Sequence, residues 1–457
     1  MTSPSQPRRI RPAEAIFIFL LLLLFPTACS CWPSLPAMIH QGGCGWPQYA
    51  AGSVSSSGGG AQSVALPPKT YIAYSHKGDI WIMDNDGKNK KRLTSDPARE
   101  FSLSAGYQAE KIWFIRASGN TSETLNYGDV YSCDYDGKNL KRVTAGLKVG
   151  FAAVSPNGKS LAISVISPMP DATGSGSPGE TADMWLVNAQ GTKLTAASPH
   201  YNLTGDLEPS VVGGREGSIY AAWSKATDKI VFTFKPDGSS SLGISTRTVY
   251  LANADGSGRT VLAKSADQPS FDGFGTSVAV TTGAHWDTMG VARVNTEGGV
   301  PVDVLPVASG ASLYSTYNPT FITTYEDVKE WPTVVYGKTT HPAAPAQPVN
   351  TLEKYRIDDA KTTVLDTREG AENVITNITT DNLFSAIFFQ TGKTAGLDVS
   401  NATIWSVKPD GTALKMLSVA AGDDDSEPIA AVSYSWYNKG KIGGTNYYST
   451  CHWPYKK

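Results

Sequence analysis

Acidic and amide side chains recur along the chain, each just ahead of a segment with the composition of a β-strand. Carboxylate and amide oxygens are the ligands that hard cations such as Ca²⁺ prefer, and carboxylates also pair with cationic segments of a partner. The residues are Glu100, Glu208, Gln268, Glu372 and Glu427, with Asp423, Asp424 and Asp425 close to the last. They form a site only if the fold brings them to one opening; otherwise each is a solvated turn residue.

A second set of side chains suited to binding lies in the stretch His285, Trp286 and Asp287, with similar pairs at Asn126-Tyr127 and His200-Tyr201. The ordinary alternative is that these are scattered aromatics on solvated loops. The six histidines show no zinc-ligand spacing, and no G-x-S-x-G motif occurs. The sequence therefore predicts no catalytic residue, no transition metal and no cofactor, and leaves Ca²⁺ at a shared opening as the one ion to consider.

The N-terminus is predicted to be an export signal. Three arginines precede an apolar run from Ala15 to Phe25, which is too short for a bilayer core because spanning takes about 20 helical residues. Thr27-Ala28-Cys29 resembles the end of a bacterial lipobox, with Pro26 in place of the usual branched apolar residue. We expect residues 1–28 to be a lipoprotein-type signal peptide and Cys29 to carry the lipid; acylation at Cys31 and cleavage without lipid stay open.

Composition divides the remainder of the chain. Residues 29–69 are rich in Gly, Ser and Pro without hydrophobic periodicity, which is typical of a tether. Over the whole chain 39 Lys and Arg face 41 Asp and Glu, so no basic field exists to hold phosphate backbones, and nucleic acid is not expected as a partner. Charged residues make up 18% and Gly 44 of 457, and this turn-rich, charge-poor balance favours an all-β protein.

One pattern repeats from residue 70 onward: a strand-like run, a second run with Trp or Tyr, an Asp-Gly turn and a short strand often ending Leu-Thr. The clearest copies are 79–94 and 129–144, and weaker ones centre on Trp185, Tyr250, Val291, Tyr355 and Trp405. An additional strand ahead of several copies makes each unit four-stranded. Residues 70–457 are therefore predicted to be a seven-bladed β-propeller of four-stranded antiparallel blades, with an irregular sandwich as the alternative.

Two of the turns, 84–89 and 134–139, also read like the start of an EF-hand loop. They lack its final Glu and its flanking helices, so we predict tight turns there and no calcium loop.

The repeat resembles that of the TolB-like β-propellers, a WD-like propeller family whose units carry Asp-Ile-Tyr, then Asp-Gly, then Leu-Thr. Asp79-Ile80-Trp81, Asp86-Gly87 and Leu93-Thr94 match this order. The resemblance covers residues 70 to 450 and weakens in the fifth and sixth copies, where 297–299 and 358–360 replace the Asp-Gly turn. It implies a protein of the bacterial envelope that binds peptides and cations at the mouth of a central channel, although such repeats identify fold better than function.

The ends of the repeat indicate how the ring closes. The first copy lacks its innermost strand, and a surplus strand-like segment begins at Glu427, so the N- and C-terminal strands are expected to share blade 1 and remove an exposed sheet edge. The insertions fall between second and third strands, on what we call the long-loop face. They are Ala117–Gly128, Ser167–Ala182, Lys235–Arg247, Gly337–Thr351 and Gln390–Ala402. Loops this long are uncommon without a purpose, so binding is predicted on this face.

The same ring closure suggests how two of the cysteines could pair. It would bring the neighbourhoods of Cys44 and Cys451 together, and a disulfide between them would lock the ring in an oxidising compartment. Connectivity cannot be deduced from sequence, so free thiols or other pairings stay open. Cys133 lies inside a third strand and is expected to be an unpaired, packed thiol.

The functional prediction is a secreted, lipid-anchored propeller, in the periplasm or at the cell surface, that binds an envelope protein or peptide without catalysing a reaction. Its contact with the membrane is expected through the lipid alone. The alternative is a propeller that cleaves or binds polysaccharide, such as a lyase or glycosidase with paired carboxylates or a His-rich metal site at the channel mouth.

Replacing the predicted lipid acceptor tests the anchor. Cys29→Ala should move the protein from the membrane to the soluble fraction, because a variant without the thiol cannot be acylated there. Mass spectrometry of the mature N-terminus should find the lipid on Cys29 of the wild type. A variant that stays in the membrane with no lipid on its N-terminus contradicts the anchor, and lipid on Cys31 corrects the site.

Overall fold

The computed structural model describes residues 69–106, 109–117, 127–168, 180–189, 193–207, 215–217, 220–234, 246–285, 287–309, 313–322, 333–343, 346–380, 386–395, 398–420 and 425–433. All of them belong to one compact unit, Gln62–Lys457. The predicted signal peptide, Cys29, Cys44, Cys451, Glu208, Trp286, Asp423 and Asp424 lie outside the described residues. The described part of the chain contains no helix long and apolar enough to cross a membrane.

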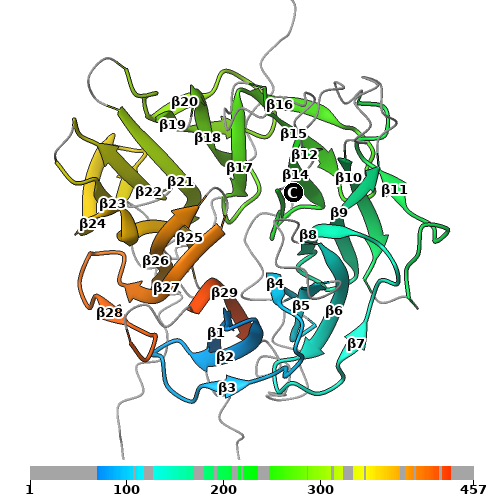
Figure 1. Cartoon of the computed structure of the whole chain (residues 1–457). Helices are drawn as coiled ribbons and strands as arrows, with labels where there is room; N and C mark the ends of the chain where they lie inside the picture. Colours follow the sequence, from blue (N-terminus) through cyan, green and yellow to red (C-terminus); the bar gives the residue numbers. More distant parts are fainter. Residues whose placement is uncertain are drawn as a thin grey trace, which may run out of the picture. The chain divides into compact units, whose positions relative to one another are not determined.

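The described strands form antiparallel sheets that follow one another around a common centre (Figure 1). Three sheets have four strands each. The first contains β29 (Asp425–Ser433), β1 (Lys69–His76), β2 (Asp79–Asp84) and β3 (Lys91–Arg92). The second contains β13 (Ala221–Trp223), β14 (Lys229–Phe234), β15 (Thr248–Asn253) and β16 (Thr260–Lys264). The third contains β25 (Val374–Thr380), β26 (Ile387–Ala395), β27 (Asp398–Val407) and β28 (Lys415–Met416).

Two larger sheets are each made of two four-strand sets that share a single residue pair, Gly128 with Val149 in one and Thr288 with Tyr314 in the other. The one joins β4 (Glu100–Gly106), β5 (Lys111–Ala117), β6 (Gly128–Asp134) and β7 (Lys141–Arg142) to β8 (Val149–Val154), β9 (Ser160–Pro168), β10 (Glu180–Asn188) and β11 (Tyr201–Asn202), with β12 (Arg215–Gly217) beside β10. The other joins β17 (Ala266–Phe271), β18 (Ser277–His285), β19 (Thr288–Asn295) and β20 (Val302–Leu305) to β21 (Leu313–Ile322), β22 (Thr333–His341), β23 (Val349–Arg356) and β24 (Lys361–Glu369).

These strands make seven four-strand sets among the described residues, which we call blades and number in chain order. The first strand of each lies nearest the centre and the fourth at the periphery, as β4 and β7 of blade 2 show (Figure 1). A short 3₁₀ helix, Ala371–Asn373, precedes β25. The predictions of an all-β fold and of four-stranded antiparallel blades are confirmed.

The ring closes through a strand from each end of the described chain. β29 pairs antiparallel with β1, from Lys69 opposite Ser433 to His76 opposite Asp425, and so becomes the innermost strand of blade 1. This confirms that the chain ends share the first blade. Without β29, the inner edge of β1 would expose a row of unpaired backbone groups.

The hydrophobic core lies between blades, because each of its seven clusters draws on two consecutive blades. Phe114 and Cys133 of blade 2 pack with Ile80 of blade 1, whereas Phe388 of blade 7 packs with Ile72 on the other side of blade 1. Successive residues of a strand point to opposite faces, so a blade covered on both sides needs apolar residues on both. Each blade is therefore stable only against its two neighbours.

Cys133 is one of these core residues and is fully buried and unpaired, which confirms the prediction of a packed thiol. Burial raises the pKa of the Cys133 thiol to about 12. It is thus held as a neutral thiol at physiological pH, and thiols of this kind are poor nucleophiles.

The residues of the repeat form a recurring set of hydrogen bonds in blades 1, 2 and 3. In blade 2, Asp129 opens β6 and accepts from Arg142 and from the Thr144 hydroxyl at 2.8 Å, and that hydroxyl accepts the Val130 N–H at 2.9 Å. Blade 3 repeats the contact between Thr204 and Asp183 at 2.9 Å. The Asp and Thr of the repeat are therefore structural residues that fasten the fourth strand to the third.

The Asp-Gly turns join one blade to the next. Gly137 has φ +81°, and its N–H donates to Asp134 O at 2.8 Å, which confirms the predicted tight turn. The same turn holds the Asp134 carboxylate by a bond from Asn139 at 2.6 Å. A Cβ on Gly137 would lie 3.1 Å from the carbonyl oxygen of Leu93 in blade 1, so the glycine lets the turn sit directly on the preceding blade.

Two of the five predicted long loops are largely strand. The segment Gly337–Thr351 is a hairpin of β22 and β23 in which Gly337 still pairs with Leu352, and Gln390–Ala402 is a hairpin of β26 and β27. Both segments contain β-branched residues, such as Thr339 and Thr340 in the first and Thr391 and Val399 in the second, and these favour extended backbone. The residues 118–126, 169–179 and 235–245 of the other three loops lie outside the described part.

Alanine substitutions at two glycines separate backbone strain from contact between blades. Gly137→Ala and Gly146→Ala each place an alanine at positive φ, +81° and +74°, at a cost of about 1–2 kcal/mol. Only Gly137 faces a neighbouring blade, since nothing lies within 4 Å of a Cβ on Gly146. We expect Gly137→Ala to lower the melting temperature more than Gly146→Ala. Equal melting temperatures would show that the turn does not support the junction.

Candidate functional site

The innermost strands, which face the channel, share a recurring departure from regular β-structure. In five of the innermost strands a bulged residue is polar and has left-handed backbone. These residues are Ser102 (φ 54°), Gln268 (φ 49°), Asn318 (φ 44°), Asn377 (φ 49°) and Glu427 (φ 51°). Left-handed backbone costs a non-glycine residue about 1–2 kcal/mol, so a compensating interaction is expected at each. We call these five residues the inter-blade belt.

The compensation is a hydrogen bond to the neighbouring blade, seen first around blade 1. The Glu427 carboxylate accepts the backbone N–H of Ser102 at 2.5 Å, and the Ser102 hydroxyl accepts the N–H of Ala152 in blade 3 at 3.2 Å. On the other side, Gln390 of blade 7 accepts the N–H of Glu427 at 2.7 Å. One line of side chains thus ties blades 7, 1, 2 and 3 together.

The same arrangement continues through blades 5 to 7. The Gln268 amide oxygen accepts the N–H of Asn318 at 2.8 Å, and the Asn318 amide oxygen accepts the N–H of Asn377 at 2.8 Å. Gln268 also bonds to Tyr220 of blade 4. The backbone N–H groups of Ser102, Asn318, Asn377 and Glu427 each donate to a side chain of the previous blade, so the bulge and the polar side chain occur together.

The belt decides the role of two residues that the sequence singled out. Gln268 and Glu427 do lie on the channel side of the innermost strands, partly exposed, but their side-chain oxygens bind backbone of the next blade. Their binding of a ligand stays a prediction. The belt itself was not recognised from the sequence, although a polar residue followed by proline recurs at Gln268-Pro269, Asn318-Pro319 and Glu427-Pro428 and could have revealed it.

Glu100 does not lie at an open channel mouth, contrary to expectation. Its side chain has no exposed area, and Oε1 accepts from Arg116 Nε and Nη2 at 2.9 and 2.7 Å. Thr94 donates its hydroxyl to the other oxygen. Burial raises the pKa of Glu100, and the bonds from Thr94 and Arg116 oppose that rise. The prediction was wrong because the strand of Glu100 begins inside the junction of blades 1 and 2, where a carboxylate needs a buried partner.

The remaining predicted carboxylates divide between exposed and buried positions. Glu372 is exposed on the 3₁₀ helix before β25. Asp425 is buried at the start of β29 and contacts the His76 ring nitrogen at 2.5 Å, and burial raises the pKa of its carboxyl. Among the described residues no three His, Cys, Asp or Glu side chains come close enough to share a metal ion. Calcium at the mouth stays a prediction, without Glu100 as a ligand.

His285 and Asp287 do come together, at the tip of the hairpin between β18 and β19 on the long-loop face. His285 Nδ1 lies 2.7 Å from Asp287 Oδ1, and the His285 side chain is 54% exposed. The Asp287 carbonyl accepts the N–H of Tyr314, the second residue of β21. The hairpin of blade 5 is therefore fastened to the first strand of blade 6.

Side chains of blade 6 extend this group. Lys338 Nζ lies 5.0 Å from the centre of the Tyr314 ring, within range of a cation–π contact, and 3.4 Å from Glu353 Oε1. His341, at the end of β22, bonds through Nε2 to the Ser315 hydroxyl at 2.8 Å, and burial lowers the pKa of His341 while Asp287 opposes that shift. We call His285, Asp287, Tyr314, Lys338 and His341 the blade 5–6 patch. Sequence reasoning found its first two members; the other three come from strands about 30 to 55 residues further on.

Substituting Glu100 tests the cost of burying its carboxylate. A carboxyl whose pKa is raised by folding stabilises the protein below its unfolded pKa and loses that contribution as the pH rises through the folded pKa. The free energy of unfolding of the wild type, relative to Glu100→Gln, should therefore be larger at about pH 4 than at about pH 7 in urea titrations. Glu372→Gln is the control for loss of an exposed carboxylate. A difference that grows with pH would show that Arg116 and Thr94 outweigh burial.

Known proteins resemble this chain in structure only. No protein-family model matches it, and no curated protein matches it. Among solved structures, a puromycin-hydrolysing peptidase from Mycobacterium tuberculosis is 12% identical with a TM-score of 0.51 over 77% of this chain and 52% of that chain. A putative TolB from Agrobacterium tumefaciens is 13% identical, with a TM-score of 0.39 over 67% of this chain and 91% of its own.

An oligogalacturonate lyase from Vibrio parahaemolyticus is 10% identical, with a TM-score of 0.44 over 79% of this chain and 90% of its own. At such identities a likeness carries the fold and no activity. The strand order, the shared first blade and the repeat residues agree with it. The chain thus has the β-propeller fold, as its repeat, which resembles that of the TolB-like propellers, predicted.

Proposed function

We propose that this protein is a non-enzymatic binding module that engages a protein or peptide partner through the long-loop face and the channel mouth. The observation that carries the proposal is the blade 5–6 patch. It gathers an exposed imidazole, a carboxylate, an aromatic ring and an ammonium group at one end of two adjacent blades. Aromatic and charged side chains on a rigid frame are the usual anchors of protein recognition.

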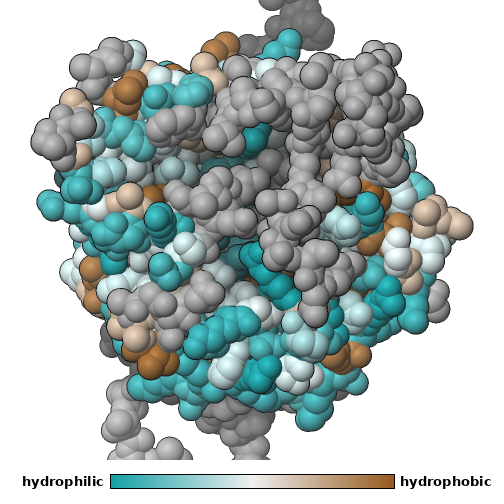
Figure 2. Space-filling view, viewed as in Figure 1, coloured by the Kyte–Doolittle hydropathy of each residue, from teal (hydrophilic) through white to brown (hydrophobic). Residues whose placement is uncertain are grey.

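The frame supports a binding role because its polar channel residues hold it in one shape. Five belt residues are each fixed between neighbouring blades, so the hairpins that project from those blades keep their spacing. A site that does not move on binding spends little free energy on ordering. Figure 2 shows mostly hydrophilic residues among the coloured atoms of the face in view, with hydrophobic ones in small separate groups.

The setting of this module is proposed from the N-terminus alone. An export signal over residues 1–28 and a lipid on Cys29 would place the propeller in the periplasm or at the cell surface, held to the membrane by the tether. A partner there would be a protein or peptide of the bacterial envelope. A disulfide between Cys44 and Cys451 would add a covalent clasp to the ring closure.

The alternative, an enzyme that cleaves polysaccharide, finds no supporting contact among the described residues. Such an enzyme would have paired carboxylates or a His-rich metal site at the channel mouth. Glu100 is buried against Arg116, and Asp425 is buried against His76. We therefore do not propose catalysis.

Photocrosslinking from two positions of one blade tests the proposed face. A benzoylphenylalanine at position 285 should form a covalent adduct with a partner in cells of the source organism, because His285 is exposed on the patch. The control position is Val300, which is 86% exposed in the turn between β19 and β20, at the opposite end of blade 5. We expect an adduct from 285 and none from 300.

Mass spectrometry of the adduct then decides the class of partner. An envelope protein or peptide crosslinked at 285, and lost when Lys338 is replaced by alanine, supports the proposal. Adducts from position 300 alone would show that the partner binds at the opposite end of the blades and would contradict the proposed face. Absence of any adduct from 285 would contradict a protein partner at this patch.

A further inference from the structure

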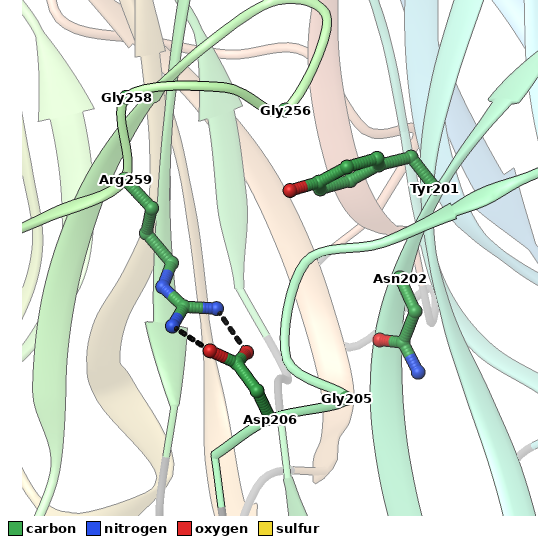
Figure 3. A pocket seen from close by; sticks show the side chains of 7 residues that line it. All are labelled: Tyr201, Asn202, Gly205, Asp206, Gly256, Gly258 and Arg259. Atoms are coloured by element: carbon green, nitrogen blue, oxygen red, sulfur yellow. Dashed lines mark hydrogen bonds and ion pairs between the residues drawn. The ribbon is translucent and has the colours of Figure 1, made fainter.

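A pocket of about 410 Å³ lies at the periphery between blades 3 and 4, and neither the proposed partner site nor the repeat explains it. Its lining comes from the start of β11 and the segment after it, and from the turn between β15 and β16. The lining residues are Tyr201, Asn202, Gly205, Asp206, Gly256, Gly258 and Arg259 (Figure 3). Its volume falls within the range of about 300–1,000 Å³ that is typical of small-molecule sites.

This junction departs from the others at a defined position. By strand register, Tyr201 occupies the place of Lys91 in blade 1 and Lys415 in blade 7, since each lies opposite the residue that follows the third-strand Trp. The two lysines bond to a carbonyl in the turn of the next blade, Asp136 O and Asp86 O. Tyr201 replaces that link by an aromatic ring that is 49% exposed.

The turn glycine shows the same departure. At three junctions a Cβ on the turn glycine would meet a leucine of the preceding blade, namely Leu417, Leu93 and Leu365. Those three leucines are between 3% and 9% exposed. At this junction a Cβ on Gly256 would instead lie 2.3 Å from Tyr201 Cδ1. The junction is therefore not filled as the others are, and the ring borders an opening.

The charges of the pocket cancel. Arg259 Nη1 and Nη2 donate to the two oxygens of Asp206, each at 2.6 Å, and Arg259 Nη1 also donates to Leu203 O. Figure 3 shows this bidentate pair on one side of the pocket and the Tyr201 ring between Gly256 and the segment with Gly205. The guanidinium holds the pKa of Asp206 below its usual range. A charged ligand would meet no net opposite charge here.

Several polar groups around the opening have capacity to spare. Asn202 uses its amide oxygen for the Thr204 N–H at 3.0 Å, while its Nδ2 donates to no residue of the described part. The Tyr201 hydroxyl likewise bonds to no described residue. The Asp206 side chain is 71% exposed, so its outer lone pairs face solvent beside the guanidinium. Donors, acceptors and an open ring therefore line an electrically neutral space.

We propose that this pocket binds a neutral, hydroxyl-rich ring, the chemistry of an uncharged sugar unit. The negative face of an aromatic ring attracts the weakly positive C–H groups on one side of a pyranose. The amide, the phenol and the carboxylate can donate to and accept from its hydroxyls. The site lies at the Asp-Gly turn end of the blades, opposite to the long-loop face. Sugar binding here can therefore be tested independently of the proposed partner binding.

Titration of the full chain with defined sugars tests this site. The neutral probes are methyl glucoside, N-acetylglucosamine and maltose, and the charged comparators are glucuronate and glucosamine. Binding is measured by saturation-transfer NMR and calorimetry. We expect saturable binding of at least one neutral sugar below about 10 mM, and weaker binding of both charged ones. Tyr201→Ala should weaken that binding about tenfold, and Tyr201→Phe, which keeps the ring, should weaken it less.

Lys91→Ala is the matched control, because Lys91 has the same strand position in blade 1 and lies outside the pocket. It should leave sugar binding unchanged, and melting curves show that all variants are folded. The proposal is overturned if no neutral sugar binds saturably, if the charged sugars bind more tightly, or if folded Tyr201→Ala binds as the wild type does. The crosslinking result at position 285 has no bearing on any of these outcomes.

Discussion

The pairing of β29 with β1 is the contact on which the rest of the structure depends. Every core cluster lies between two blades, so no blade can bury both of its faces unless it has a neighbour on each side. In an open row the first and last blades would each expose an apolar face. The seven residue pairs between β29 and β1 complete blade 1 from both ends of the described chain and thereby close the row into a ring.

The inter-blade belt and the Asp-Gly turns support this closure at different levels. The turns let blades sit close together at one end, through glycines at positive φ that leave room for the preceding blade. The belt works on the channel side, where bulges at positive φ are offset by hydrogen bonds from the next blade's N–H. These bonds are partly buried, and a buried donor left without a partner would destabilise the fold. Polar residues along the channel are thus largely part of the framework.

Both proposed sites lie at the ends of the blades, away from the belt. At one end the blade 5–6 patch joins a hairpin tip to the start of the next blade, through the N–H of Tyr314 on the Asp287 carbonyl. At the other end, Tyr201 and the Arg259–Asp206 pair interrupt the regular junction between blades 3 and 4. Both places differ from the repeat, and a departure from an otherwise regular repeat is where selection for binding is most readily seen.

The fold could be predicted from the sequence because the residues that indicate it are close together in the chain and recur in several blades. Asp79 and Asp129 open third strands, Gly87 and Gly137 mark turns, and the surplus strand at Glu427 indicated closure. The same residues also explain the fourth strands, since Asp129 binds Arg142 and Thr144 fifteen residues or fewer away. Interactions over such short separations leave a pattern in the order of residues.

Only the tertiary structure decided which polar residues are buried or bonded within the framework and which are exposed. Glu100 and Glu372 are both acidic residues ahead of an innermost strand, yet one is buried against Arg116 and the other exposed on a 3₁₀ helix. Gln268 and Asn318 are 50 residues apart and meet because two blades are adjacent. Tyr201 and Arg259 border one pocket for the same reason. Burial and contact between blades depend on the ring as a whole, so residue type and local spacing determined the blades, and only their closure determined the sites.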